Sequence, residues 1–526
     1  MALLSLFAVA SVAVLSACAN SKPVADLAII NGVVFVGDGA PGYTADVVIT
    51  GDRIVAVGRS ARHGYRIRET IDAVGRTVSS GFIDPHTHAL SALNYLEAPQ
   101  PLEHYLRQGV TTLVIGNDGG GPPTIAERRS HLRRLKMGPN VAQFVGHNAL
   151  RERVIGLDNR APTPSELSEM TALAEQAMQE GALGLSTGLY YPPGVYATTD
   201  EVVALARVAA QYDGLYESHL RDESSYSVGL LAAVDEALEV GRRSGARVHI
   251  AHIKALGVDV WGYSERVIDR IETARAAGQV VTADQYPWRA SGTRLGNALL
   301  PGWSRAGGRG ALLQRLEAPE LLARIREEMG DNLRRRGGAD AILLTSGSFA
   351  GQTLASVATA RAEPALATAL ALIRDGETRI ASFNMHEDDI RQFMRQPWVV
   401  TSSDGTRGHP RLFASFPQKF AAYVQEQNVL TMPEFIQRSS ATTADLLKLC
   451  DRGRLRVGAF ADVIVFDLAS FAPQADFETP DRLSVGVQHV IINGEVVMRD
   501  AKLKQAGAGR ALSRGQCDSE PAGVRQ

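Results

Sequence analysis

The sequence Gly81-Phe82-Ile83-Asp84-Pro85-His86-Thr87-His88 decides the expected fold. The small and apolar residues from Val78 to Ile83 predict a buried strand, which Pro85 ends. In an extended backbone, residues i and i+2 point to the same side, so His86 and His88 can face a single point. Neutral imidazole is the commonest metal-binding side chain. The stretch therefore predicts half of a metal site at a strand end, with two structural histidines as the alternative.

The composition is that of a soluble globular protein. The 526 residues are too many for one ordinary domain, and 45% of them are hydrophobic and 21% charged. The net charge is −2 and no long basic run occurs, so a nucleic-acid partner is not expected. The three cysteines, Cys18, Cys450 and Cys517, are too few for a cysteine-rich zinc module, and they predict no disulfide framework.

The first residues resemble a bacterial lipoprotein signal. The stretch from Ala2 to Ala17 is almost wholly apolar but too short for a comfortable membrane span. Leu15-Ser16-Ala17-Cys18 has the small residues of a processing site ahead of a cysteine. We therefore expect residues 1–18 to be a signal peptide with a lipobox-like cysteine, and the protein to be exported, either periplasmic or anchored to a bacterial membrane through lipidated Cys18. One feature departs from the pattern, since no Lys or Arg precedes the apolar stretch. The alternative is an apolar tail on a cytosolic enzyme.

Both ends of the chain carry β patterns. Between residues 26 and 80, apolar runs are separated by Asn31-Gly32 and Gly51-Asp52, which are typical turn sequences. A matching block lies between residues 450 and 500. Neither block is large enough for a core of its own, so we expect the two to form one small β-sandwich domain. Residues 81–449 then carry the chemistry.

The middle of the chain alternates apolar strands with amphipathic helices, which predicts an α/β fold. Counting the strand before His86, eight strand-like runs occur, the number for a closed (β/α)8 barrel of the TIM type. The other seven are Thr112–Gly116, Val141–Gly146, Leu183–Thr187, Leu215–Ser218, Val248–Ala251, Val280–Ala283 and Val399–Ser402. Arg379–Phe383 is a ninth candidate, either a barrel strand or an edge element. The helical stretch 291–344 predicts an inserted subdomain or lid near the last barrel strand, and residues 501–526 predict a loose C-terminal tail.

Polar residues stand at the carboxyl ends of three of these strands. His219 follows Leu215–Ser218, His252 follows Val248–Ala251, and Asp404 follows the last strand. In a barrel, such positions face the active site. A single histidine at a strand end is most often a hydrogen-bonded structural residue. Four histidines at the ends of three strands, together with an aspartate, favour a metal site.

These residues resemble the amidohydrolase superfamily, whose pattern is HxH after the first strand, histidines after the fifth and sixth, and an aspartate after the eighth. Further motifs narrow the resemblance, from residue 26 to residue 500, to the N-acyl-D-amino-acid deacylase (D-aminoacylase) family. They are Gly116-Asn117-Asp118-Gly119, Gly146-His147-Asn148, Gly188-Leu189-Tyr190-Tyr191-Pro192, Asp284-Gln285-Tyr286-Pro287 and His409-Pro410-Arg411.

The resemblance implies a Zn²⁺ site with one or two ions, or another divalent metal, held by His86, His88, His219 and His252. Several members of the family carry a cysteine ligand where this chain has Asp118. A carboxylate is also a competent zinc ligand. The alternative is that Asp118 is only a turn residue, as its neighbours Asn117 and Gly119 favour.

The expected function is metal-dependent cleavage of the acyl-amide bond of N-acyl-D-amino acids, which gives a free D-amino acid and a carboxylic acid. Asp404 is the expected catalytic group, taking a proton from the attacking water and delivering it to the departing amine. The α-carboxylate of this small-molecule substrate needs cationic donors, for which Arg411 and Lys254 are candidates. The resemblance also implies Tyr191 and Tyr286 as hydroxyl donors. For each of these four residues the alternative is an ordinary salt-bridge or packing role, and selectivity for D over L substrates comes from the resemblance alone.

Two other functions stay open on the sequence. One is a dipeptidase or a cyclic-amide hydrolase, of the dihydroorotase or hydantoinase kind, on the same scaffold. The other is a ligand-binding lipoprotein without catalytic activity, against which the intact set of histidines and Asp404 argues.

Overall fold

The computed structural model describes residues 22–93, 101–504 and 507–515. The expected signal peptide and Cys18 lie outside these ranges. Within them, no helix has the length and apolar character needed to cross a membrane.

Cys450 is disulfide-bonded, against the expectation from the sequence, and the other two cysteines lie outside the described residues. Three cysteines widely spaced along a chain carry no signal of which two meet in space.

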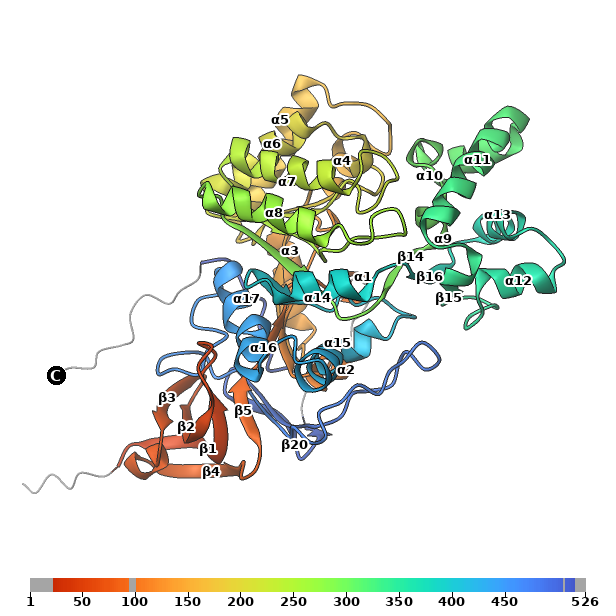
Figure 1. Ribbon diagram of the computed structural model, residues 1–526. Helices are drawn as coiled ribbons and strands as arrows, with labels where there is room; N and C mark the ends of the chain where they lie inside the picture. The colour runs from red at the N-terminus through yellow and green to blue at the C-terminus, as the bar shows by residue number, and fades with distance from the viewer. Residues whose placement is uncertain (1–21, 94–100, 505–506, 516–526) are drawn as a thin grey trace, which may run out of the picture.

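Strands from both ends of the chain form one nine-stranded sheet, seen at the lower left of Figure 1 with red and blue segments together. Its central contact is antiparallel, between β5 and β18, where Val78 faces Val465. The strands are β1 (Val24–Phe35), β2 (Tyr43–Thr50), β3 (Arg53–Gly58), β4 (Arg66–Asp72), β5 (Thr77–Ser80), β18 (Val463–Phe466), β19 (Val487–Ile492), β20 (Glu495–Arg499) and β21 (Lys502–Leu503).

All nine strands of this sheet connect through hydrogen bonds, so the two ends of the chain form one β domain, and its sandwich shape stays a prediction. The expected turn at Asn31-Gly32 is wrong: β1 continues through it as a bulge and pairs with β4 before it and β5 after it. Asn31 has a φ of 62°. A Cβ on Gly32 would lie 2.4 Å from Cγ2 of Val78, so only glycine allows β5 to pack this closely.

The central part of the chain contains two parallel sheets, joined where β8 runs into β9. One has the order β6-β7-β8 and the other β17-β13-β12-β11-β10-β9. The strands are β6 (Phe82–Asp84), β7 (Val110–Ile115), β8 (Asn140–Gln143), β9 (Val145–Gly146), β10 (Gly184–Gly188), β11 (Leu215–His219), β12 (Arg247–Ile250), β13 (Val281–Gln285) and β17 (Val399–Thr401). Ile83, Val114, Leu215 and Val400, from four of these strands, pack in one buried cluster with Phe144, which lies between β8 and β9.

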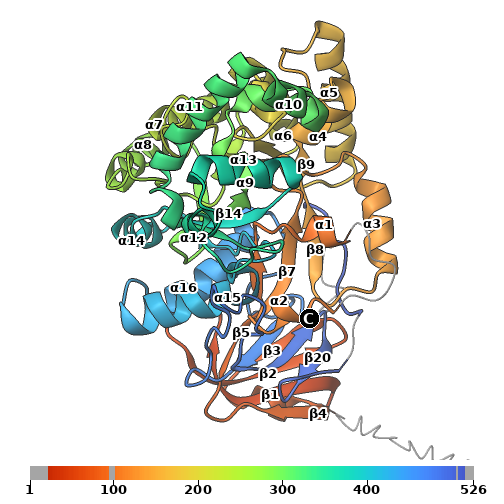
Figure 2. The same cartoon turned by 90° about the vertical axis from the view of Figure 1, so that its right-hand side faces the viewer.

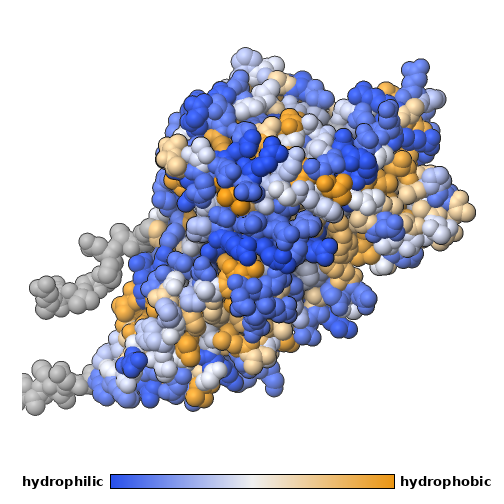
Figure 3. Space-filling model, in the orientation of Figure 1, coloured by the Kyte–Doolittle hydropathy of each residue, from blue (hydrophilic) through white to orange (hydrophobic). Residues whose placement is uncertain are grey.

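Helices follow most of these strands, and in Figures 1 and 2 α5 to α8 cover the upper part of the molecule. A threonine side chain caps the start of two of them: Thr163 accepts a hydrogen bond from Glu166 N–H, and Thr198 accepts one from Glu201 N–H. The surface over these helices is mostly hydrophilic in Figure 3. The helices are α1 (Ala89–Leu93), α2 (Glu103–Leu106), α3 (Ile125–Arg134), α4 (His147–Val154), α5 (Pro164–Gln179), α6 (Thr199–Gln211), α7 (Leu230–Ser244), α8 (Ser264–Ala276), α14 (Glu387–Arg395), α15 (Arg411–Lys419), α16 (Met432–Ser439) and α17 (Ala441–Leu446).

An inserted subdomain lies between β13 and α14, at the right of Figure 1. It runs from residue 290 to residue 383, beyond the predicted limit at 344, because the ninth candidate strand, Arg379–Phe383, pairs antiparallel with two strands of the insertion. Its elements are β14 (Ala290–Arg294), α9 (Leu295–Leu299), α10 (Gly308–Glu317), α11 (Pro319–Arg335), β15 (Ile342–Leu344), α12 (Leu354–Ala360), α13 (Ala365–Asp375) and β16 (Arg379–Phe383).

The expected loose tail is wrong for part of residues 501–526. Lys502 and Leu503 form the last strand of the large sheet, and residues 507–512 run beside β8 and Met137, which precedes it. Val141 N–H donates to Arg510 O at 2.9 Å, and Leu512 N–H donates to Val141 O at 2.8 Å. A polar composition did not reveal these contacts, since they use only backbone groups.

Lys419 generates a stability prediction. The last residue of α15 is fully buried, and its Nζ makes no hydrogen bond with a described residue. Burial, and repulsion from Arg438, lower the pKa of Lys419 from its ordinary 10.5 to about 7. Between pH 7 and pH 10.5 the unfolded chain holds a proton on Lys419 that the folded chain has released, so the free energy of unfolding rises with pH through this window. Below about pH 7 the buried amine is charged in the folded chain, and its cost to stability is greatest there.

We therefore expect Lys419→Met to raise the free energy of unfolding by a few kcal/mol at about pH 6.5, at about 1.4 kcal/mol per pKa unit, and by much less at about pH 9.5. Urea denaturation at the two pH values measures this. Lys448→Met is the control, because Lys448 is 44% exposed and pairs with Asp213. An equal gain at both pH values would contradict the interpretation.

Candidate active site

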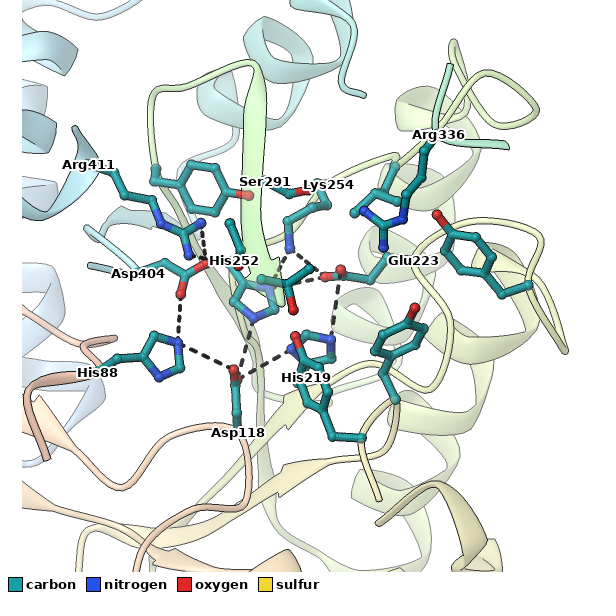
Figure 4. Close-up of a pocket in the computed structure, with 17 residues that line it drawn as sticks. His88, Asp118, His219, Glu223, His252, Lys254, Ser291, Arg336, Asp404 and Arg411 are labelled. Atoms are coloured by element: carbon teal, nitrogen blue, oxygen red, sulfur yellow. Dashed lines mark hydrogen bonds and ion pairs between the residues drawn. The ribbon is translucent and has the colours of Figure 1, made fainter. Parts of the chain in front are cut away.

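A pocket opens where the carboxyl ends of the central parallel strands meet the inserted subdomain (Figure 4). Its side chains come from β11, β14, the first residue of α15, and the segments that follow β6, β7, β10, β11, β12, β13, β17 and α11. The pocket is lined by His88, Asp118, Tyr190, Tyr191, His219, Glu223, Tyr226, His252, Lys254, Leu256, Tyr286, Ser291, Gly292, Thr293, Arg336, Asp404 and Arg411.

Asp118 lies at the centre of the imidazole cluster. Its Oδ1 is 3.4 Å from Nε2 of His86, 3.4 Å from Nε2 of His252 and 3.5 Å from Nδ1 of His219. Its Oδ2 lies 3.6 Å from Nε2 of His88. One carboxylate therefore contacts all four histidines that the sequence places at strand ends.

Asp404 joins His88 to Arg411. Its Oδ1 lies 2.9 Å from Nε2 of His88 and 3.8 Å from Nε2 of His86, and its Oδ2 is 2.7 Å from Nη1 of Arg411. The guanidinium that the sequence assigns to a substrate carboxylate thus already forms an ion pair with Asp404. Arg411 is fully buried, and its Nη2 also donates to Gly292 O at 3.3 Å.

Two buried glutamates lie behind the histidines. Glu217 Oε1 is 3.3 Å from Nδ1 of His86, and Glu223 Oε1 is 3.1 Å from Nδ1 of His252. In both rings the other nitrogen, Nε2, faces Asp118. Each glutamate thus lies on the opposite side of an imidazole from Asp118, the position from which carboxylates orient metal-binding histidines.

Lys254 and Tyr286 lie beside the same cluster. Lys254 Nζ is 2.5 Å from Oε1 of Glu223 and 2.6 Å from Nδ1 of His252. The Tyr286 ring centroid lies 5.6 Å from this Nζ and 4.7 Å from Cζ of Arg411, and the Tyr286 hydroxyl makes no hydrogen bond with a described residue. The Tyr191 ring packs against His219, with 4.7 Å between centroids.

The buried carboxylates of the pocket remain ionised. Burial alone would raise the pKa of Glu223, but the positive charge of Lys254 and the neighbouring imidazoles hold it well below its ordinary value. Burial acts in the same direction on Asp404, where Arg411 and His252 outweigh it and lower the pKa of the carboxyl. The pKa of Asp118 is likewise lowered, because His86, His219 and His252 outweigh burial.

The donor set fits a divalent metal. Both ring nitrogens of His86, Nδ1 of His219 and Oδ1 of Asp118 are buried, and none of them makes a hydrogen bond with a described residue. Buried polar atoms without partners are costly, and two of these, Nε2 of His86 and Nδ1 of His219, face Oδ1 of Asp118. Three overlapping groups have the spacing of metal ligands: His86, His88 and Asp404; His86, Asp118 and His252; and His219, Glu223 and His252. Imidazole and carboxylate suit Zn²⁺ and similar ions.

All the residues that the sequence singled out lie in or against this pocket. They are His86, His88, Asp118, Tyr191, His219, His252, Lys254, Tyr286, Asp404 and Arg411. Glu223 and Arg336 were missed. Glu223 had a signal, since it lies four residues after His219, whereas Arg336 follows a charged helix of the insertion and nothing near it in sequence distinguishes it.

The sequence matches the Amidohydrolase family over residues 69–277 and 308–498, more than half of the chain. The chain belongs to the amidohydrolase family. The expected resemblance to N-acyl-D-amino-acid deacylases is also confirmed. This amidohydrolase is 32% identical to a D-aminoacylase of Alcaligenes xylosoxydans xylosoxydans over 94% of this chain and 99% of the relative. It is 34% identical to an N-acyl-D-glutamate deacylase of the same organism, over 90% of this chain and 94% of the relative.

A solved structure agrees with these relatives. The N-acyl-D-glutamate deacylase from Bordetella bronchiseptica, complexed with zinc and a phosphonate inhibitor that mimics the tetrahedral intermediate, has a TM-score of 0.80 at 30% identity. The match covers 93% of this amidohydrolase and 100% of that chain. The histidine and carboxylate groups of this amidohydrolase have the spacing to hold one or two divalent ions.

We expect Asp118→Asn to weaken metal binding, because a neutral amide replaces the carboxylate that contacts all four histidines. The loss should be at least about 10-fold in affinity, the effect that removal of even an outer partner of a metal site brings. Metal content after dialysis, determined by mass spectrometry, measures it. Asp200→Asn is the control, because the Asp200 side chain is 81% exposed on α6. Unchanged metal content in Asp118→Asn would show that Asp118 is a turn residue only.

Proposed function

We propose that this amidohydrolase is a metal-dependent N-acyl-D-amino-acid deacylase, which hydrolyses the acyl-amide bond to give a D-amino acid and a carboxylic acid. The observation that carries the proposal is that one pocket contains both a set of metal-binding groups and a pair of cations. The imidazole and carboxylate cluster meets Lys254 and Arg411, the kind of cations that bind a free carboxylate. The relatives named above, which are deacylases of N-acyl-D-amino acids by name, support the same reaction.

We propose His86, His88, Asp118, His219 and His252 as the metal ligands, with Glu217 and Glu223 orienting the rings of His86 and His252. A bound divalent ion supplies positive charge that polarises the substrate carbonyl and makes a water molecule more acidic. Removal of zinc is therefore expected to abolish turnover.

Asp404 is proposed to move the proton. The carboxylate is ionised, so it can accept a proton from the attacking water and deliver it to the departing amine nitrogen. His88 and Arg411 hold its two oxygens from opposite sides, at 2.9 Å and 2.7 Å. Both contacts fix the direction of the oxygens, which proton transfer at short range requires.

Lys254, Arg411 and Tyr286 are proposed to bind the α-carboxylate of the substrate. The three side chains are close together, since the Tyr286 ring lies within 5.6 Å of both cations. Its unpartnered hydroxyl adds a donor. Tyr191, packed against His219, is proposed as a further hydroxyl donor near the scissile bond. Hydantoins and dihydropyrimidines carry no carboxylate for this site to bind, which is why we favour linear N-acyl amino acids over these cyclic substrates.

We further propose that the eight central strand positions form a closed (β/α)8 barrel. The continuity of β8 with β9 supports this, as do the contacts between the two end strands. Asp404 N–H donates to His86 O at 3.0 Å, and Thr87 forms a parallel bridge with Gly405.

The decisive measurement is release of free amino acid from matched N-acetyl-D- and N-acetyl-L-amino acids, with and without added zinc. We expect turnover of the D substrates only, and only with metal. Asp404→Asn should lower kcat by about 100-fold or more while keeping its metal content near that of wild type, since general acid–base catalysis contributes this much. Asp200→Asn, with its exposed side chain, should match wild type. No hydrolysis of any N-acyl-D-amino acid by the zinc-loaded protein would overturn the proposal.

We also propose that the protein is exported and lipid-anchored through Cys18. The apolar stretch from Ala2 to Ala17 and the small residues ahead of Cys18 support this. Full-length protein expressed in a Gram-negative host should fractionate with membranes, whereas Cys18→Ser should be released or remain unprocessed. Cytosolic wild-type protein that keeps its first residues would contradict the proposal.

A further inference from the structure

A third cation, Arg336, lines the pocket and comes from the inserted subdomain. It follows the last residue of α11, and its side chain is only 2% exposed. In Figure 4, Arg336 and Arg411 lie on opposite sides of the view, with Lys254 and Glu223 between them. The pocket thus has cationic groups at two separate ends.

Arg336 differs from the other two cations in its partners. Arg411 is paired with Asp404, and Lys254 with Glu223. Arg336 forms no ion pair with any carboxylate in the described part of the chain, and no dashed line reaches it in Figure 4.

The groups that hold Arg336 are neutral. Its Nε donates to Ala298 O at 3.1 Å, and its Nη1 donates to the side-chain oxygen of Asn384 at 3.2 Å. A buried guanidinium is costly unless an anion compensates it. These contacts fix the position of the guanidinium without neutralising its charge.

Tyr226 supplies a second donor at this end of the pocket. The Cζ of Arg336 lies 5.4 Å from the centre of the Tyr226 ring. The hydroxyl of Tyr226 is buried, and it makes no hydrogen bond with a described residue. Tyr190 also lines this end, but its hydroxyl already donates to Asn297 O at 2.7 Å. A charged donor and an unused neutral donor therefore border the same space.

The charge of the whole pocket points in the same direction. The three carboxylates Asp118, Glu223 and Asp404 balance the three cations Lys254, Arg336 and Arg411. Asp404 lies against Arg411 and Glu223 against Lys254, whereas Asp118 lies among the histidines, so Arg336 is the lining cation that no carboxylate of the described residues contacts.

We propose that Arg336, with Tyr226, binds a second carboxylate of the substrate, so that the preferred substrates are dicarboxylates. The inference rests on the proposed deacylase function and names its substrate class. The first carboxylate is the α-carboxylate at Lys254 and Arg411. The second belongs to an acidic amino-acid side chain or to a dicarboxylic acyl group.

The test compares kcat and KM for pairs of substrates that differ in one carboxylate. N-acetyl-D-glutamate against N-acetyl-D-glutamine examines the side chain, and N-succinyl-D-leucine against N-acetyl-D-leucine examines the acyl group. We expect wild type to prefer the dicarboxylate in one of the two pairs by at least about 10-fold in kcat/KM, the usual size of a charged hydrogen bond. The pair that shows the preference identifies the source of the carboxylate.

Arg336→Met should remove this preference, mainly by raising KM for the dicarboxylate, and leave the neutral partner within about 3-fold of wild type. Arg336→Lys should restore part of it. Arg334→Gln is the matched control, because Arg334 lies two residues away with its side chain 55% exposed and pairs with Asp259.

Two results would overturn the inference and leave the deacylase proposal standing. The first is a wild-type protein with no preference for dicarboxylates, a measurement that needs no variant to fold. The second is an equal loss of kcat/KM on all substrates in Arg336→Met, which would mark a structural role for Arg336. If wild type hydrolyses none of the four substrates, the deacylase proposal fails, and this inference fails with it.

Discussion

The burial of charge at the strand ends is the constraint on which the rest of the structure depends. Glu223 and Asp404 are 7% and 5% exposed, and the Asp118 side chain is 10% exposed. Removing a carboxylate from water costs several kcal/mol unless other groups replace the water. Lys254 and Arg411 do this for Glu223 and Asp404. Asp118 has only imidazoles around it, at distances that leave its Oδ1 without a hydrogen bond. A cation bound among the imidazoles and Asp118 would give these buried polar atoms a partner. Metal binding and the stability of the fold are therefore coupled.

The same constraint explains the backbone of the site. Asp118, His252 and Asp404 have φ values of 54°, 35° and 47°, a region that costs a non-glycine residue about 1 kcal/mol or more. Hydrogen bonds from neighbouring strands hold two of them: His252 N–H donates to Asp284 Oδ1, and Asp404 N–H donates to His86 O. The strain is therefore offset outside the site, and it directs side chains from different strands toward one point.

The sequence predicted the groups whose positions follow from local rules. His86, His88, His219, His252 and Asp404 stand directly at strand ends, and strands are recognisable as apolar runs. What it missed depends on contacts between distant segments. Arg336 enters the pocket because α11 packs against α9. The sequence Asn31-Gly32 is typical of a turn, and only the close contact of Gly32 with Val78 explains why β1 continues through it. The extent of the insertion was missed for the same reason, since Arg379–Phe383 is a strand on local evidence, and only its partners exclude it from the parallel sheets.

The two parts of the pocket have different origins, and this has a consequence for specificity. The histidines, Asp118 and Asp404 come from the ends of the parallel strands, whereas Ser291, Gly292 and Arg336 come from the insertion. Arg411 connects them, because it contacts both Asp404 and Gly292 O, and a Cβ on Gly292 would lie only 3.0 Å from its Nη2. A substitution in β14 would therefore disturb Asp404, the catalytic carboxylate, through Arg411. Arg336, in contrast, makes no ion pair with the described residues of the metal cluster, and it contacts the insertion through Ala298. Residues at the Arg336 end can consequently vary with little effect on the proton-transfer geometry, so substrate preference can change there while the chemistry at the strand ends is kept.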